Sequence, residues 1–181
     1  MLDMSRVDID PYELFSSVSR VLSGPGLLLV SVGKSGKPNP MTIGWGFVGE
    51  VWDMATFTAI VRTARYTHEL IGQSMDFTVN VPKRGMDEAL SICGTLSGRN
   101  VDKIGKARLT PSPARSTRSP IIRECVAHIE CSVVCRLDMG DEGMTDVIRP
   151  FYGEANRHSF FIGEILHSYA DADYASQLPS S

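Results

Sequence analysis

Apolar and polar side chains alternate along residues 124–137 more regularly than anywhere else in the chain. The apolar positions are Cys125, Ala127, Ile129, Cys131, Val133, Cys135 and Leu137, and His128, Glu130, Ser132 and Arg136 lie between them. Because successive side chains of a strand point to opposite faces of a sheet, this pattern predicts a long strand. We expect one face to be buried and the other, with His128, to be largely exposed to water.

Shorter runs of the same kind predict the remaining strands. These lie at 27–32, 38–48 (a strand or an irregular edge), 54–61, 77–81 and 158–166; helices are expected at 11–22, 67–74 and 86–93, a surface connection at 110–120 and a tail at 169–181. Asp10 and Thr67 are the expected caps of the first two helices. Strands outweigh helices and do not alternate with them, which argues against a parallel sheet. The expected fold is mainly β, an antiparallel barrel with short peripheral helices, forming a single domain over residues 1–181.

Charge and hydropathy narrow the possible partners. The net charge is -3 and there is no basic tract, which argues against nucleic acid and against an anionic membrane surface. No apolar run approaches the roughly 20 residues of a membrane span. The first residues, Met-Leu-Asp-Met-Ser-Arg-Val-Asp, are unlike a signal peptide. We therefore expect a cytoplasmic protein.

The cysteines do not predict a metal site. Cys93, Cys125, Cys131 and Cys135 contain no Cys-x-x-Cys pair, and no histidine completes a zinc spacing. On one strand Cys131 and Cys135 would be about 13 Å apart, too far for a disulfide. We expect buried free thiols. No Ser-His-Asp order and no catalytic pair of carboxylates is recognisable, so no catalytic residue is predicted.

The segment Asn39–Trp45, Asn-Pro-Met-Thr-Ile-Gly-Trp, stands where a strand should continue, yet it offers little aliphatic surface. Gly44, Gly46 and the hydroxyl of Thr42 lie close to the flat ring of Trp45. Exposed backbone beside a flat ring suits a flat cofactor with polar edges. A bulged edge of a barrel is the alternative interpretation.

The segment Arg62–Thr67 ends a predicted strand and opens a predicted helix. Free N–H groups, two arginines and two threonine hydroxyls converge at this helix start, which favours a phosphate site. A capped helix with surface arginines is the alternative.

Two further segments have polar residues that a ligand could use. Small residues from Gly94 to Asn100 allow close approach of a ligand to the backbone, and Ser97 and Lys103 could reach an anion, although ordinary turn chemistry explains the same residues. Asn80 interrupts an apolar strand and needs partners, either a heteroaromatic ring edge or a neighbouring turn. His68 is expected to be solvated, and His158 has either a structural role or a ligand role.

Taken in order, these motifs resemble the flavin reductase-like family, particularly its flavoredoxin branch. The resemblance rests on Asn-Pro-Met-Thr-Ile-Gly-Trp, Arg-Thr-Ala-Arg-Tyr-Thr-His-Glu-Leu-Ile, Phe-Thr-Val-Asn-Val-Pro, Cys-Gly-Thr-Leu-Ser-Gly-Arg-Asn-Val-Asp-Lys and Phe-Ile-Gly-Glu-Ile, and covers roughly residues 20–168. It implies an FMN-binding split β-barrel that forms a homodimer, with the flavin at or near the subunit interface.

The resemblance also implies which residues contact the cofactor. Asn39 belongs to the first motif; Met41, Thr42, Ile43, Gly44 and Trp45 would line the isoalloxazine and ribityl chain; Arg62, Arg65, Tyr66 and Thr67 would surround the phosphate; Asn80 and Val81 would face the ring; Ser97, Gly98 and Lys103 would close over the phosphate and ribityl. The chain departs from the family at 52–55, at 155–158 and in an added segment at 144–152. These departures lie on the side where a second substrate would enter.

Three functions are compatible with this reading. The first is an NAD(P)H-dependent reductase of flavin or of another small acceptor, with NADH or NADPH as donor. The second is a non-enzymatic electron carrier of the flavoredoxin type that uses bound FMN and passes electrons to a small molecule or a protein. The third is a barrel that has lost its cofactor and serves as a binding module. In the first two, flavin carries the electrons and the protein positions it.

Overall fold

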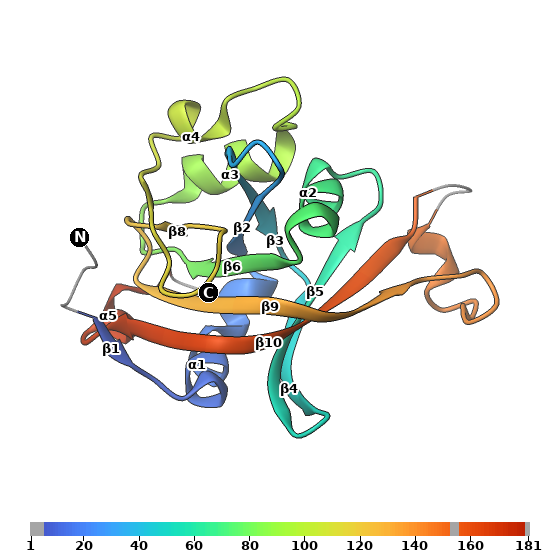
Figure 1. The fold of residues 1–181 in the computed structure, drawn as a ribbon, viewed down its shortest axis with the longest axis horizontal. Helices are drawn as coiled ribbons and strands as arrows, with labels where there is room; N and C mark the ends of the chain where they lie inside the picture. The colour runs from blue at the N-terminus through green and yellow to red at the C-terminus, as the bar shows by residue number, and fades with distance from the viewer. Residues whose placement is uncertain (1–5, 153–155, 180–181) are drawn as a thin grey trace.

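The computed structural model describes residues 6–152 and 156–179 and contains one large antiparallel sheet (Figure 1). Its strands are β1 (Arg6–Asp8), β2 (Leu27–Val32), β3 (Pro38–Ile43), β4 (Gly46–Val51), β5 (Met54–Arg62), β6 (Asp76–Val81), β9 (Ala127–Asp138) and β10 (His158–Asp171). They are ordered β3-β2-β6-β9-β10-β5-β4, with β1 paired to β10. The prediction of a mainly β, antiparallel fold is confirmed.

The helices are short and lie around this sheet (Figure 1). They are α1 (Pro11–Ser23), α2 (Tyr66–Ser74), α3 (Asp87–Thr95), α4 (Lys103–Lys106) and α5 (Tyr174–Gln177), with a 3-10 turn at Arg149–Phe151. A separate small ladder joins β7 (Pro111–Ser112) to β8 (Ile121–Ile122). Asp10 caps α1 as predicted, since its carboxylate accepts from the N–H groups of Tyr12 and Glu13.

The two edge strands of the large sheet, β3 and β4, follow each other in the chain. Of the two readings of 38–48, a strand or an irregular edge, one continuous strand is not found, because Gly44 and Trp45 interrupt it between β3 and β4. Three Cα steps separate Ile43 from Gly46, so these residues lie at most about 11 Å apart. The sheet must curl until its two edges approach each other at this link.

The hairpin between β4 and β5 turns on two non-glycine residues. Val51 pairs with Met54, and Trp52 and Asp53 have φ angles of 54° and 57°. Two consecutive left-handed residues make the type I′ turn that suits the twist of a hairpin. This turn occupies one of the positions at which the chain departs from the family pattern.

The core lies on both faces of the central strands. Phe57, Phe77 and Phe161 pack inside the curled sheet together with Leu14 and the rest of the apolar face of α1. A second cluster lies on the opposite side of β2, where Leu28 and Val30 meet α3. All six residues of β2 are buried in consequence, which explains why five of them are apolar and Ser31 is the one polar residue.

The predicted wet face of β9 is in fact buried over its first half. Glu130 is 0% exposed, and its carboxylate accepts from the backbone N–H groups of Arg115, Ser116 and Thr117 and from the hydroxyl of Tyr169. The connection at 110–120 therefore folds back over the sheet rather than running in solvent. A strand pattern cannot reveal that a distant loop covers its polar face.

Histidines and element boundaries also differ from the predictions. His128 is fully buried, and burial together with the nearby Arg6 lowers its pKa well below the usual value. His68 is half-buried and shares a hydrogen bond of 2.8 Å with the Ser159 hydroxyl.

The last strand continues to Asp171 and so includes the first part of the predicted tail. Leu137 was expected on the buried face of β9 but is 55% exposed.

The four cysteines are free thiols. Cys93, Cys125 and Cys131 are buried and Cys135 is partly exposed, close to the expectation. In the described ranges 6–152 and 156–179, no helix is long and apolar enough to cross a membrane.

Candidate functional site

Two adjoining pockets open where β3, β5 and α2 meet. The first pocket has a volume of about 250 Å³ and is lined by Met41, Thr42, Ile43, Gly44, Trp45, Ile60, Val61, Arg62, Arg65 and His158. The second has a volume of about 290 Å³ and is lined by Met41, Ala64, Arg65, Tyr66, Thr67, Thr95, Leu96, Ser97, Gly98 and Lys103. Because both include Met41 and Arg65, we treat them as one groove with two ends.

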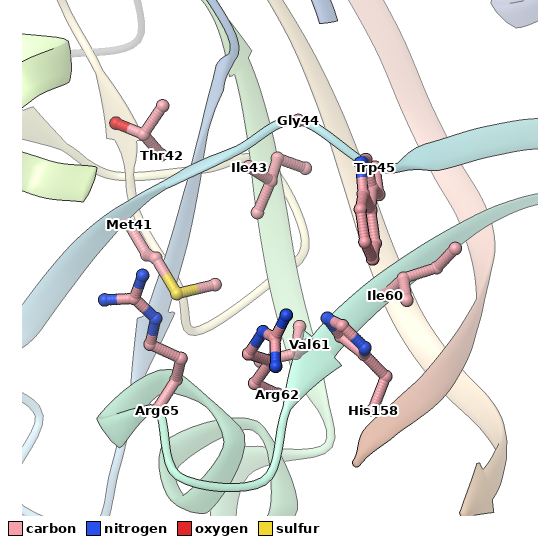
Figure 2. Close-up of a pocket in the computed structure, with 10 residues that line it drawn as sticks. All are labelled: Met41, Thr42, Ile43, Gly44, Trp45, Ile60, Val61, Arg62, Arg65 and His158. Atoms are coloured by element: carbon pink, nitrogen blue, oxygen red, sulfur yellow. The ribbon is translucent and has the colours of Figure 1, made fainter. Parts of the chain in front are cut away.

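The first pocket has an aromatic wall. The rings of Trp45 and His158 lie 5.0 Å apart between centroids with their planes tilted by 44°, and Figure 2 shows both side chains at the same end of the pocket. The Tyr152 hydroxyl hydrogen-bonds His158 Nδ1 at 2.8 Å. Burial, with the cation of Arg62 nearby, lowers the pKa of His158 to about 4. The imidazole is therefore neutral at pH 7.

The floor of the first pocket carries positive charge. Arg62 comes from the end of β5 and Arg65 from the turn before α2, and both guanidinium groups face the space below β3 (Figure 2). The residues that line this pocket include no acidic side chain. The pocket thus combines an uncharged aromatic wall, Trp45 and His158, with the two cations Arg62 and Arg65.

The second pocket holds a buried cation. Lys103 is 4% exposed, and its Nζ makes a single long contact of 3.5 Å with the carbonyl of Cys93. No carboxylate pairs with it in the part of the chain that the structure describes. Burial lowers the pKa of Lys103 to about 8, and burial raises the pKa of the Cys93 thiol to about 11. A buried ammonium without a counter-ion is costly, so this pocket favours an anion.

The start of α2 completes the second pocket. The first N–H groups of a helix have no partner within the helix and favour negative charge. Thr67 was predicted to cap α2, but it lies inside the helix, and Arg65 is at the N-cap position. The hydroxyl of Thr67 instead accepts a hydrogen bond from the Asn39 amide at 2.9 Å. A Cβ at Gly98 would lie 2.0 Å from Asn39 Oδ1 and 3.3 Å from the Tyr66 ring, so only glycine fits there.

Most of the predicted site residues meet in this groove. The first pocket gathers Met41, Thr42, Ile43, Gly44, Trp45, Arg62 and Arg65, and the second gathers Met41, Arg65, Tyr66, Thr67, Ser97, Gly98 and Lys103. Asn39 is buried beside the second pocket, where it holds Thr67. Thr42 contributes mainly its backbone, because its hydroxyl donates to the Leu90 carbonyl at 2.6 Å and lies across the strand from Met41 (Figure 2).

Asn80 and Val81 are the exceptions, because neither lines the two pockets. Asn80 is fully buried; its amide donates to the Leu28 carbonyl and the Thr78 hydroxyl, and its oxygen accepts from the Ile122 N–H. Its hydrogen-bonding groups are thus satisfied by the protein, as in the alternative interpretation of a bond to neighbouring chain.

Sequence reasoning missed several lining residues, namely Ile60, Val61, Ala64, Thr95 and Leu96, and left His158 undecided. Ala64, Thr95 and Leu96 lie within the quoted motifs, and Ile60 and Val61 directly precede Arg62. None has a side chain that suggests a ligand, and their contact with the pocket depends on the path of the chain. Tyr152 was considered only as part of an added segment. Of residues 155–158, Ala155 lies outside the described residues.

The comparison with known families agrees with this geometry. The model of the flavin reductase like domain matches residues 19–178. The chain belongs to the flavin reductase-like family.

Solved structures of this family share the fold. Flavoredoxin from Methanosarcina acetivorans is 31% identical, with a TM-score of 0.66 over 83% of this chain and 70% of that chain. An FMN-binding domain of a flavin reductases-like enzyme from Shewanella baltica OS155 is 18% identical, with a TM-score of 0.67 over 98% and 84%. A flavin reductase with a split barrel domain from Shewanella frigidimarina is 16% identical, with a TM-score of 0.67 over 91% and 76%. The curled sheet is therefore the split β-barrel of the flavin reductase-like family.

Proposed function

We propose that this chain binds FMN along the groove and acts as an NAD(P)H-dependent flavin reductase or oxidoreductase. The phosphate would occupy the second pocket and the isoalloxazine ring the first. The observation that carries this proposal is the buried Lys103, a cation that pairs with no described carboxylate, at one end of a groove whose other end has a neutral aromatic wall. FMN carries a phosphate dianion at one end and a flat ring at the other, and so fits both ends.

The residues of the second pocket suit a phosphate. Lys103 and Arg65 would neutralise its charge, and the hydroxyl of Ser97 would donate a hydrogen bond. The start of α2 adds backbone N–H groups, and the missing side chain of Gly98 lets its backbone pack closely against Asn39 and Tyr66 at the pocket edge. Binding would relieve the cost of burying Lys103 unpaired.

The residues of the first pocket would hold and shield the ring. The side chains of Met41, Ile43 and Trp45 would exclude water from it, and the bond from Thr42 to the Leu90 carbonyl fixes the strand that carries them. When bound, flavin supplies the hydride and electron chemistry. We assign no catalytic residue, because His158 is neutral at pH 7 and bonded to Tyr152.

A non-enzymatic electron carrier that uses bound FMN is the second candidate. The flavoredoxin from Methanosarcina acetivorans, at 31% identity, favours it. In that case the acceptor would be a small molecule or a protein that reaches the ring from the open side of the first pocket.

One experiment separates the two candidates. We expect the purified protein to show flavin absorption bands after incubation with FMN, and anaerobic addition of NADH or NADPH to bleach them. Catalytic oxidation of either nucleotide with excess FMN would support the reductase. If the flavin binds but neither nucleotide reduces it, the carrier replaces the reductase. If no flavin binds, both candidates fail.

We also propose a cytoplasmic homodimer with the flavin near the subunit interface. Exposed apolar side chains along β4 and at its two ends support this, since Trp45, Phe47 and Trp52 are 45%, 46% and 57% exposed. A charge at the centre of an apolar interface is costly, so Phe47→Asp should weaken the dimer by at least about tenfold. Sedimentation equilibrium measures this, with the distant Val7→Asp as control. A monomeric wild-type protein would refute the proposal.

A further inference from the structure

We propose that Arg62 recognises the anionic group of the second small molecule that reacts at the flavin ring. The ligand class is a flat molecule that carries an oxyanion, either carboxylate or phosphate. This inference rests on the proposed function, because it concerns the co-substrate of the same groove. It differs from the expectation that Arg62 surrounds the flavin phosphate.

The first observation is the position of Arg62 relative to the other cations. Lys103 lines only the second pocket and Arg65 lines both, whereas Arg62 lines only the first. The pocket proposed for the phosphate therefore already has two cations, Lys103 and Arg65, and does not need Arg62. The charge of Arg62 lies instead at the end assigned to the ring, where a reacting molecule must enter.

The second observation is how Arg62 is held. Its Nη1 donates to the carbonyl of Asn156 at 3.3 Å and its Nη2 to the carbonyl of Phe151 at 3.4 Å. Its guanidinium also lies over the Tyr152 ring, 5.7 Å from the centroid. These contacts orient a side chain with five N–H donors and leave others for a ligand. All of these partners are neutral, and within residues 6–152 and 156–179 no carboxylate pairs with the guanidinium.

The third observation is the surroundings of this charge. Among residues 6–152 and 156–179, no carboxylate forms an ion pair with Arg62, and the first pocket has no acidic lining residue. The neighbouring His158 and Trp45 form the aromatic wall. An oriented guanidinium that pairs with no described carboxylate, at the end of the groove proposed for the flat flavin ring, matches a planar ligand with a carboxylate or phosphate, since arginine binds such groups through two parallel hydrogen bonds.

The contacts that hold Arg62 come from the added segment of this chain. Phe151 and Tyr152 end the stretch 144–152, and Asn156 follows it before β10. The segment that distinguishes the chain from the family pattern thus orients the cation. We infer that it sets the specificity for an anionic co-substrate.

A matched pair of probes tests this inference without turnover. Benzoate and benzamide have the same ring and differ in charge, and each is titrated into the FMN-loaded protein while the visible flavin spectrum is followed. We expect benzoate to bind about tenfold more tightly than benzamide, and Arg62→Gln to abolish the difference by weakening benzoate alone. Phenyl phosphate is the third probe, and its affinity relative to benzoate distinguishes a phosphate group from a carboxylate.

The control variant is Arg99→Gln, which removes the same charge from a side chain that stacks on Tyr66 but lines neither pocket. It should keep the preference for benzoate. Equal affinity of the wild-type protein for benzoate and benzamide would overturn the inference. So would a preference for benzoate that survives Arg62→Gln.

A second measurement tests whether Arg62 contacts the flavin itself. Arg62→Gln should bind FMN and riboflavin within about threefold of the wild-type values. A loss confined to FMN would make Arg62 a phosphate ligand, and an equal loss of both would place it on the ring; either result overturns the inference. If FMN does not bind the wild-type protein, the proposed function fails; the same probes, titrated against tryptophan fluorescence of the flavin-free protein, then test whether Arg62 binds an oxyanion at all.

Discussion

Replacing Lys103 with methionine should stabilise the flavin-free protein and weaken its binding of FMN. The buried ammonium has no counter-ion, and burial lowers its pKa from 10.5 to about 8. That shift corresponds to a penalty on the order of 3 kcal/mol in the free energy of unfolding at neutral pH. FMN affinity should fall about ten- to hundredfold, the usual effect of losing one hydrogen bond to a charged group. Urea denaturation and flavin titration measure the two changes.

The pH dependence gives a further check on Lys103. Its pKa in the folded chain lies below that in the unfolded chain, so the unfolded chain binds the proton more tightly. The penalty is complete below pH 8 and disappears as the pH rises toward 10.5. FMN binding should weaken above pH 8, because the phosphate requires the protonated amine. In the methionine variant both of these trends should be absent.

Lys106→Met is the matched control for Lys103. Lys106 belongs to the same short helix, α4, but its side chain is exposed. Its replacement should change stability by less than about 0.5 kcal/mol and leave FMN affinity unchanged. A Lys103→Met protein that is less stable than the wild type would contradict the view of an uncompensated buried cation.

Replacing Arg65 with alanine should weaken FMN about ten- to hundredfold and riboflavin by much less. Arg65 lines both pockets beside the start of α2, where the phosphate is proposed to bind. Only FMN has the phosphate, and a hydrogen bond to a charged group contributes about 1.5–3 kcal/mol. Parallel fluorescence titrations with the two flavins measure the change in their affinity ratio.

Arg99→Ala provides the control for this prediction. Arg99 lies near the same helix but pairs with Glu69 and stacks on Tyr66, outside both pockets. It should leave the ratio of FMN to riboflavin affinity within about threefold. If Arg65→Ala weakens both flavins equally, the phosphate does not bind where we propose.

The fold was largely predictable because its signals are local. The alternation at 124–137 and the apolar run at 27–32 became β9 and β2, and Asp10 caps α1 as expected. The errors arose where distant segments meet. The covered face of β9 depends on the connection at 110–120, and the break at Gly44–Trp45 depends on how the sheet curls.

The candidate site was likewise predictable where its signals are local and unpredictable where distant segments meet. Arg65 before α2 and the small residues around Gly98 indicate close approach to an anion, and they do meet in the second pocket. Asn80 resembles a ligand residue in a strand, yet its partners come from β2 and from residues beyond 120. The separate position of Arg62 could not be read from its proximity to Arg65, because it depends on carbonyls from the segment before β10.

Calorimetric titration of the flavin-free protein with FMN and with riboflavin tests the two-ended groove most directly. We expect FMN to bind at one site per chain and at least about tenfold more tightly than riboflavin, because only FMN places a phosphate beside Lys103 and Arg65. Binding of FMN that is no tighter than that of riboflavin, or no binding of either, would contradict it.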